Sequence, residues 1–114
     1  MAKSRVNKTD EAAIEKYLVK SIENLGGIAW KFTAPKVRGV PDRIILIKDL
    51  IFFVELKKTG EHLRALQLWR KIQLQDQGFT VLVIDSINKV DELIENIVGG
   101  KHEQLRNYIQ FSKF

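Results

Sequence analysis

The chain has 114 residues, a length that corresponds to one domain with a single hydrophobic core. Hydrophobic residues make up 45% and charged residues 29% of it, close to globular averages, which excludes collagen-like, coiled-coil and disordered chains. Cysteine is absent, which excludes disulfides and cysteine-ligated zinc. No apolar stretch reaches the roughly 18 residues that span a bilayer, and the polar N-terminus lacks the features of a signal peptide. We therefore expect an intracellular protein that does not contact membranes.

The net charge of +5 is unevenly distributed along the chain. Between Lys31 and Lys71, ten basic residues accompany four acidic ones, so this segment carries a charge of +6. Residues 72–100 carry a charge of −4. A basic segment within a neutral or acidic chain is typical of a surface that binds a polyanion such as nucleic acid, although an ordinary solvated surface explains the same charges.

The first predicted element is a helix with Thr9 as its N-cap and acidic residues in its first turn. Four apolar residues then recur at helical spacing, namely Ile14, Leu18, Ile22 and Leu25. The pair Gly26-Gly27 ends the helix. Glu15 lies at the edge of the apolar stripe, so we expect its carboxylate near the protein interior.

The rest of the compact unit is predicted to contain four strands and two helices. The expected strands are residues 28–32, 43–48, 51–57 and 80–84, and the expected helices are residues 63–77 and 90–98. A tight connection at Asp49-Leu50 predicts an antiparallel hairpin of the second and third strands. The helical crossover allows the fourth strand to run parallel to the third. Asn88 is a candidate cap for the last helix.

This order of elements predicts an α/β domain over residues 1–100, with a mixed sheet and helices on both faces. Residues 101–114 form a basic tail outside it, with apolar residues at roughly helical spacing, namely Leu105, Tyr108, Ile109 and Phe111. The tail is a packed helix, an arm that contributes to a dimer, or a remnant of cloning.

The predicted hairpin carries polar residues that do not fit a plain core. Glu55 follows four apolar residues in a strand that looks central, and Lys57 projects to the same side two residues later. Asp42 precedes the neighbouring strand, so the hairpin brings its carboxylate near Glu55. A buried carboxylate needs a cation. Either an ion pair with Lys57 or a divalent metal such as Mg²⁺, which prefers oxygen ligands, supplies one.

These residues resemble a known nuclease signature. Pro41-Asp42, followed after twelve residues by Glu55-Leu56-Lys57, is similar to the motif of the PD-(D/E)XK superfamily. The stretches GVPDR at 39–43 and FVELK at 53–57, with Gln67 in the following helix, resemble the VRR-NUC group, the virus-type replication–repair nuclease module. AIEKYL at 13–18 and GGIAWKF at 26–32 are similar to stand-alone phage members. The resemblance covers roughly residues 10–95.

The resemblance implies a restriction-endonuclease-like αβββαβ core and an endonuclease that depends on Mg²⁺ or Mn²⁺. It implies that Asp42, Glu55 and the backbone carbonyl of Leu56 bind the metal, and that Lys57 is the catalytic lysine. Gln67 is expected to support Lys57 or the attacking water. The family also has an acidic residue in the first helix, for which Glu15 is preferred as a metal ligand and Glu11 is the alternative. Basic residues near the site are expected to contact DNA, namely Lys36, Arg38, Arg43, Lys58 and Arg64.

Stand-alone phage modules of this kind resemble Holliday-junction resolvases, which act as homodimers on four-way junctions. We therefore expect a structure-selective DNA endonuclease without a nucleotide cofactor, in the cytoplasm of a bacterial or phage-infected cell. A flap or nicking endonuclease and a catalytically idle DNA-binding subunit are the alternatives. The dimer interface is expected to use Trp30 and Phe32, or Trp69, or the tail.

Overall fold

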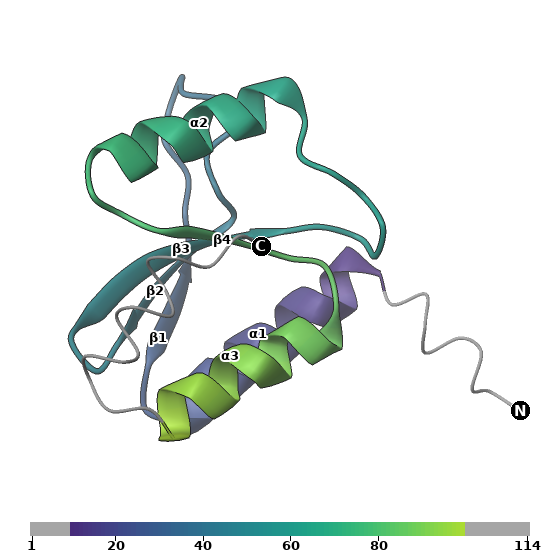
Figure 1. Cartoon of the computed structure of the whole chain (residues 1–114), viewed down its shortest axis with the longest axis vertical. Helices are drawn as coiled ribbons and strands as arrows, with labels where there is room; N and C mark the ends of the chain where they lie inside the picture. The colour runs from purple at the N-terminus through teal and green to yellow at the C-terminus, as the bar shows by residue number, and fades with distance from the viewer. Residues whose placement is uncertain (1–9, 100–114) are drawn as a thin grey trace, which may run out of the picture.

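The structure, a computed structural model, describes residues 10–99, which form a four-stranded sheet with helices on both faces (Figure 1). The elements are α1 (Glu11–Asn24), β1 (Ile28–Lys31), β2 (Arg43–Ile47), β3 (Leu50–Leu56), α2 (Ala65–Asp76), β4 (Val81–Ile84) and α3 (Ile87–Gly99). The strands lie side by side in chain order. The predicted α/β class with a mixed sheet is confirmed. The tail at residues 101–114 lies outside the described residues, so its expected helix stays a prediction.

The N-cap of helix α1 lies one residue later than expected. The cap is Asp10, whose carboxylate accepts a hydrogen bond from the backbone N–H of Ala13 at 2.8 Å, so the assignment of Thr9 is wrong. An aspartate in this position satisfies an N–H group that lacks a partner within the helix, and the helix dipole stabilises its negative charge. Three residues of the predicted apolar stripe are fully buried against the sheet, namely Ile14, Leu18 and Ile22.

The strands pair as the sequence predicts, with one shift at the hairpin turn. β2 and β3 are antiparallel, and β4 runs parallel to β3. The turn consists of Lys48 and Asp49, both in the left-handed region with φ of 49° and 53°, which suits the twist of a two-residue hairpin. The expected Asp49-Leu50 connection is therefore one residue late, because Leu50 is buried and pairs with Ile47.

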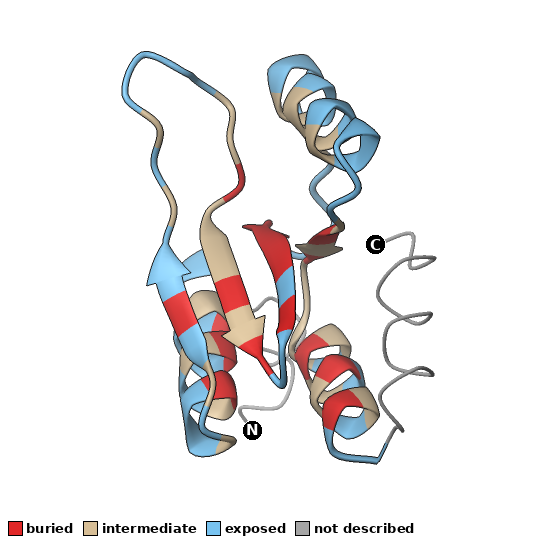
Figure 2. Cartoon of the chain, turned by 90° about the vertical axis from the view of Figure 1, so that its left-hand side faces the viewer, coloured by how far each residue is buried: buried red, intermediate tan, exposed pale blue. Residues whose placement is uncertain are grey.

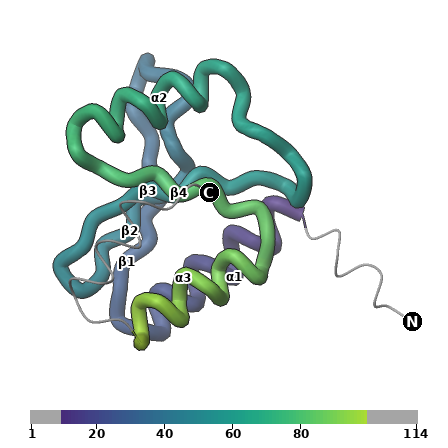
Figure 3. The backbone as a smooth tube through the Cα atoms, in the orientation of Figure 1, coloured from purple at the N-terminus to yellow at the C-terminus, as the bar shows by residue number. Residues whose placement is uncertain are grey.

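The main core lies between the sheet and the two helices α1 and α3, which run side by side on one face (Figure 3). It includes Ala29, Ile45, Phe52, Val54, Leu56, Leu82 and Ile84 from the strands. Helix α3 begins at Ile87 and is capped by Ser86, whose hydroxyl accepts from the N–H of Lys89 at 3.1 Å. Asn88 therefore lies inside the helix, and its prediction as a cap is wrong.

Helix α2 lies beyond one end of the sheet on the other face, and none of its twelve residues is buried (Figure 2). The predicted apolar stripe of this helix stays in contact with solvent, with Leu68 and Trp69 exposed at 48% and 55%. On the same side of the sheet, the ring of Phe53 packs against Phe32 and Phe79, with centroid distances of 5.1 and 6.2 Å. No helix within residues 10–99 is both long enough and apolar enough to cross a membrane.

Candidate active site

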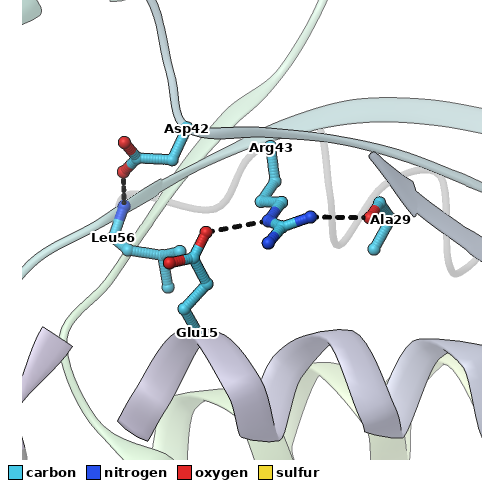
Figure 4. Close-up of polar contacts among 5 residues, drawn as sticks. All are labelled: Glu15, Ala29, Asp42, Arg43 and Leu56. Carbon is cyan, nitrogen blue, oxygen red and sulfur yellow. Dashed lines mark hydrogen bonds and ion pairs between the residues drawn. The ribbon is translucent and has the colours of Figure 1, made fainter. Parts of the chain in front are cut away.

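Asp42 lies directly before β2 and is held by the strands on both sides. Its backbone N–H donates to the carbonyl of Val54, and its own carbonyl accepts from the N–H of Phe32. Its carboxylate oxygen Oδ2 accepts from the backbone N–H of Leu56 at 2.7 Å (Figure 4). The hairpin therefore places the half-buried Asp42 side chain against the Glu55-Leu56-Lys57 segment, as the sequence predicts.

Glu55 lies near the end of β3, where its side chain is only 4% exposed. Its oxygen Oε2 accepts a hydrogen bond from Nε2 of Gln67 at 2.9 Å. The other end of the same amide, Oε1, accepts from the backbone N–H of Arg64 at the start of α2. The structure thus places Gln67 on the carboxylate, whereas we had expected it to support Lys57 or the attacking water.

Both carboxylates lie in surroundings that disfavour their charged forms. Burial, together with the neighbouring charge of Asp42, raises the pKa of Glu55 from 4.5 to about 8. Burial is also the main cause that raises the pKa of Asp42, and the N–H of Leu56 partly opposes it. Removal of water from a carboxylate is costly unless a cation replaces the lost solvation. This pair of acids therefore has the electrostatic properties of a cation site.

Among the described cations, Lys57 has the largest electrostatic effect on both Glu55 and Asp42, and it is itself only 5% exposed. Its backbone N–H continues the pairing with β4 by donating to the carbonyl of Ile84 at 3.0 Å. Within residues 10–99, its ammonium group forms no ion pair, although it lowers the pKa of both Glu55 and Asp42 electrostatically. The simple Glu55–Lys57 ion pair, considered from the sequence, is thus not formed.

Glu11 and Glu15, the two acids in the first half of α1, have different surroundings. Glu15 accepts a hydrogen bond and ion pair from Nε of Arg43 at 2.8 Å, and Arg43 also donates to the carbonyl of Ala29 (Figure 4). Glu11 forms no ion pair within the described residues, and its pKa is raised by burial and by the charge of Asp42. Glu11 also acts electrostatically on Glu55. Both acids thus lie near the site, since the charge of Glu15 also raises the pKa of Asp42, but only Glu15 is paired with a cation.

The loop before Asp42 packs closely on α2. Gly39 has a φ of 86°, and a Cβ atom there would lie 2.8 Å from Cγ of Leu66. Nε of Arg70 donates to the carbonyl of Arg38 at 2.7 Å. A residue with a side chain at position 39 would push α2 away, so this glycine permits the approach that holds Gln67 over Glu55.

Comparison with known proteins identifies the family. No protein-family model matches the chain. Over 77 residues it is 44% identical to "Putative nuclease p44" of Acyrthosiphon pisum secondary endosymbiont phage 1, a match that covers 67% of this chain and 83% of the phage protein. Its structure also aligns with a solved "VRR_NUC domain" with a TM-score of 0.72 and 32% identity, covering 76% of this chain and 96% of that one. The chain belongs to the VRR-NUC family.

The basic residues that we expected to contact DNA divide into two groups in this VRR-NUC domain. Four are exposed to solvent, namely Lys36, Arg38, Lys58 and Arg64. Arg43 is instead partly buried and holds α1 against β1 through Glu15 and Ala29. Its role in DNA binding stays a prediction, but its contacts are those of a residue that positions the first helix beside Asp42.

Two features of the VRR-NUC site did not emerge from the sequence. Arg70 fixes the loop before Asp42 through a backbone carbonyl, and no sequence pattern singles out such a contact. The second is a set of lysines on α1 and β1, two of which, Lys16 and Lys20, stand four residues apart on one face of the helix. The four-residue spacing of Lys16 and Lys20 was the feature of the sequence that could have indicated this set of lysines.

Proposed function

We propose that this VRR-NUC protein is a metal-dependent DNA endonuclease that hydrolyses phosphodiester bonds beside Asp42, Glu55 and Lys57. The observation that supports it most is the convergence of these three side chains at one end of the sheet, with Glu55 and Lys57 buried. Membership of a nuclease family agrees with this chemistry. The exposed cations around the site suit a substrate with a phosphate backbone.

The donor set fits Mg²⁺ or Mn²⁺. Asp42 and Glu55 supply hard oxygen ligands, and burial makes their charges costly without a cation. No cluster of three or more metal-ligating side chains occurs within residues 10–99, so the carbonyl of Leu56 and water molecules would complete the coordination. When bound, the ion would neutralise charge on the scissile phosphate and lower the pKa of a coordinated water.

The chain's own residues would orient the reacting groups. The ammonium of Lys57, fixed on a buried strand and without an ion-pair partner in the described chain, is available to donate to the attacking water or to the phosphate oxygens. Gln67 fixes the rotamer of Glu55. Between Glu11 and Glu15, we assign the supporting role to Glu11, because Glu15 is paired with Arg43. The metal-binding role expected of Glu15 stays a prediction.

A panel of DNA substrates tests this function. Linear, nicked, flap and four-way DNA are incubated with the protein while Mg²⁺ or Mn²⁺ is titrated. We expect metal-dependent cutting that is lost in Asp42→Asn and Glu55→Gln but retained in Glu92→Gln, a matched change on the exposed side of α3. Cutting by Glu55→Gln at the wild-type rate would refute the site assignment. DNA binding without cutting under every condition would instead favour the idle DNA-binding subunit.

For the substrate, we propose a branched DNA, with a four-way junction as the favoured form and cutting in the cytoplasm of a bacterial or phage-infected cell. One site on so small a domain contacts a short stretch of backbone that is similar in linear and branched DNA. Two sites related by a two-fold axis match the near two-fold symmetry of a junction. Flap or nicking activity is the second candidate, and the substrate panel separates the two.

The homodimer that this requires has a suitable surface. On the sheet face opposite the main core, one cross-strand row contains Ile28, Leu46 and Ile51, and the next contains Trp30, Ile44 and Phe53. Trp30 is 62% exposed and Ile51 is 48% exposed. Exposed apolar residues that are contiguous across strands are typical of an interface rather than of a monomer's surface.

Light scattering tests the dimer. We expect about twice the chain mass of 13.2 kDa for the wild type. Trp30→Glu should yield monomers, whereas Val98→Glu, at a 63% exposed position on α3, should not. Mixed dimers of wild-type and Glu55→Gln chains should nick one strand of a junction without resolving it. A monomer that cuts paired strands in concert would refute the arrangement.

A further inference from the structure

A groove of about 590 Å³ runs along the outer side of α1, between this helix and β1. Its walls carry four basic residues, Lys16, Lys20, Lys31 and Arg43, and two acidic ones, Glu15 and Glu23. Val19 and Ala12 are the apolar residues of its lining. A lining that is so largely charged does not suit an apolar ligand, whereas it offers several cations to an anion.

The charges of the three lysines in the groove are not balanced by ion pairs within the described residues. Glu15 is paired with Arg43 at 2.8 Å, and both residues line the groove. Lys16, Lys20 and Lys31 form no ion pair within residues 10–99, although Glu23 lines the same groove. All three are exposed. The groove therefore keeps three free ammonium groups against one free carboxylate.

The groove lies next to the candidate active site, because two of its lining residues, Glu15 and Arg43, act electrostatically on Asp42. Arg43, which follows Asp42 directly in the chain, contributes to its lining, and Figure 4 shows the Glu15–Arg43 pair between Asp42 and the edge of the sheet at Ala29. From there the groove follows α1 toward Glu23 and Asn24. Lys16 and Lys20 are one helical turn apart, a rise of about 6 Å, so they lie in a line that leads away from Asp42.

We propose that this α1–β1 groove binds the phosphate backbone of a nucleic acid on one side of the scissile bond, through Lys16, Lys20 and Lys31. The assignment rests on the proposed nuclease function, because that function places the scissile phosphate beside Asp42. It adds a contact surface distinct from the loop of Lys36 and Arg38. The free ammonium groups attract phosphates without reading bases, so the groove holds the backbone in register and is indifferent to sequence.

Binding of a fluorescent 20-base-pair duplex, measured by anisotropy in EDTA so that cutting does not interfere, tests the groove. The triple variant Lys16→Gln, Lys20→Gln, Lys31→Gln should weaken binding by at least about tenfold. It should also flatten the slope of log K against log salt by up to about 2.7, about 0.9 for each lost phosphate contact. A control with the same loss of charge elsewhere, Lys48→Gln, Lys71→Gln, Lys89→Gln, should stay within about twofold of the wild type.

A second measurement locates the DNA directly. The chain has no cysteine, so Lys20→Cys provides a single thiol for disulfide cross-linking to DNA with a thiol tether on one phosphate. We expect a cross-link only when the tether lies on one side of the cut at a defined distance, and none for Lys89→Cys. Equal weakening by the two triple variants, or equal cross-linking by the two cysteines, would overturn the groove assignment. The wild-type cleavage assay is read separately, so a failed groove does not count against the nuclease function.

Discussion

The amide of Gln67 donates to the carboxylate of Glu55 at 2.9 Å, which joins the first turn of α2 to the centre of the sheet. None of the residues of α2 is buried in the fold. The same amide accepts from the N–H of Arg64, so Gln67 can neither rotate nor withdraw without loss of this capping hydrogen bond at the start of α2. Its position makes it a positioning residue for Glu55.

Gln67→Ala should therefore weaken the metal site without removing a ligand. Loss of an outer partner of a metal ligand typically costs about 10- to 100-fold in affinity or activity. We expect the Mg²⁺ concentration for half-maximal cutting to rise, with much of the rate restored at high Mg²⁺. Gln75→Ala, an exposed change on the same helix, is the control. An unchanged Mg²⁺ dependence would show that the bond to Glu55 has no functional role.

Glu55→Gln should stabilise the metal-free protein at high pH. The pKa of Glu55 is about 8 in the folded protein and near 4.5 when unfolded, so stability falls as pH rises between these values. The free energy of unfolding should fall by up to about 1.4 kcal/mol per pH unit from this one group. Urea unfolding in EDTA at pH 5 and pH 8 measures it. The advantage of the variant should grow with pH, whereas Glu92→Gln should show no such trend.

Lys57→Met should separate chemistry from binding. The substitution keeps an unbranched apolar chain but removes the ammonium, so cutting should fall by several orders of magnitude while DNA affinity changes little. Lys36→Ala or Arg38→Ala should instead weaken binding and reduce its salt slope by about 0.9 each. Single-turnover cutting and anisotropy measure the two quantities. Comparable losses of affinity in both classes would contradict this division.

Glu11 and Glu15 of α1 should respond differently to neutralisation. Glu11→Gln should reduce cutting by about tenfold or more. The substitution removes negative charge beside Asp42 and Glu55, so the site attracts a cation less strongly. Glu15→Gln should mainly reduce stability, and a double-mutant cycle with Arg43→Ala should give a coupling of about 1 kcal/mol. A larger catalytic loss in Glu15→Gln, without such coupling, would return the metal-binding role to Glu15.

The sequence predicts most of this fold because its strands and first helix carry strong local signals. The apolar run before Glu55, the Gly26-Gly27 stop and the apolar spacing of α1 all correspond to observed elements. The N-caps of the helices were predicted less well. Asp10 and Ser86 compete with neighbouring polar residues that are equally good caps, and the choice depends on where the helix meets the sheet.

The site was predictable only in its acids and its lysine. Asp42 and Glu55 follow from strand pairing and a short motif, because the hairpin register fixes their separation. The partner of Glu15 did not follow, since the direction of a long arginine side chain depends on packing that no spacing encodes. The failure of α2 to bury its apolar stripe was likewise not visible, because an amphipathic pattern does not specify what covers it.

The sparse packing of α2 divides the molecule into parts of unequal local stability. The apolar surface of α2 is already largely in contact with solvent, so opening of this helix exposes little more. Opening of α1 or α3, in contrast, exposes the core. In native-state hydrogen exchange, the amides of α2 should therefore exchange well before those of the other two helices. Each such opening separates Gln67 from Glu55. The equilibrium between docked and undocked α2, and not global unfolding, therefore sets the fraction of molecules in which the site is fully assembled.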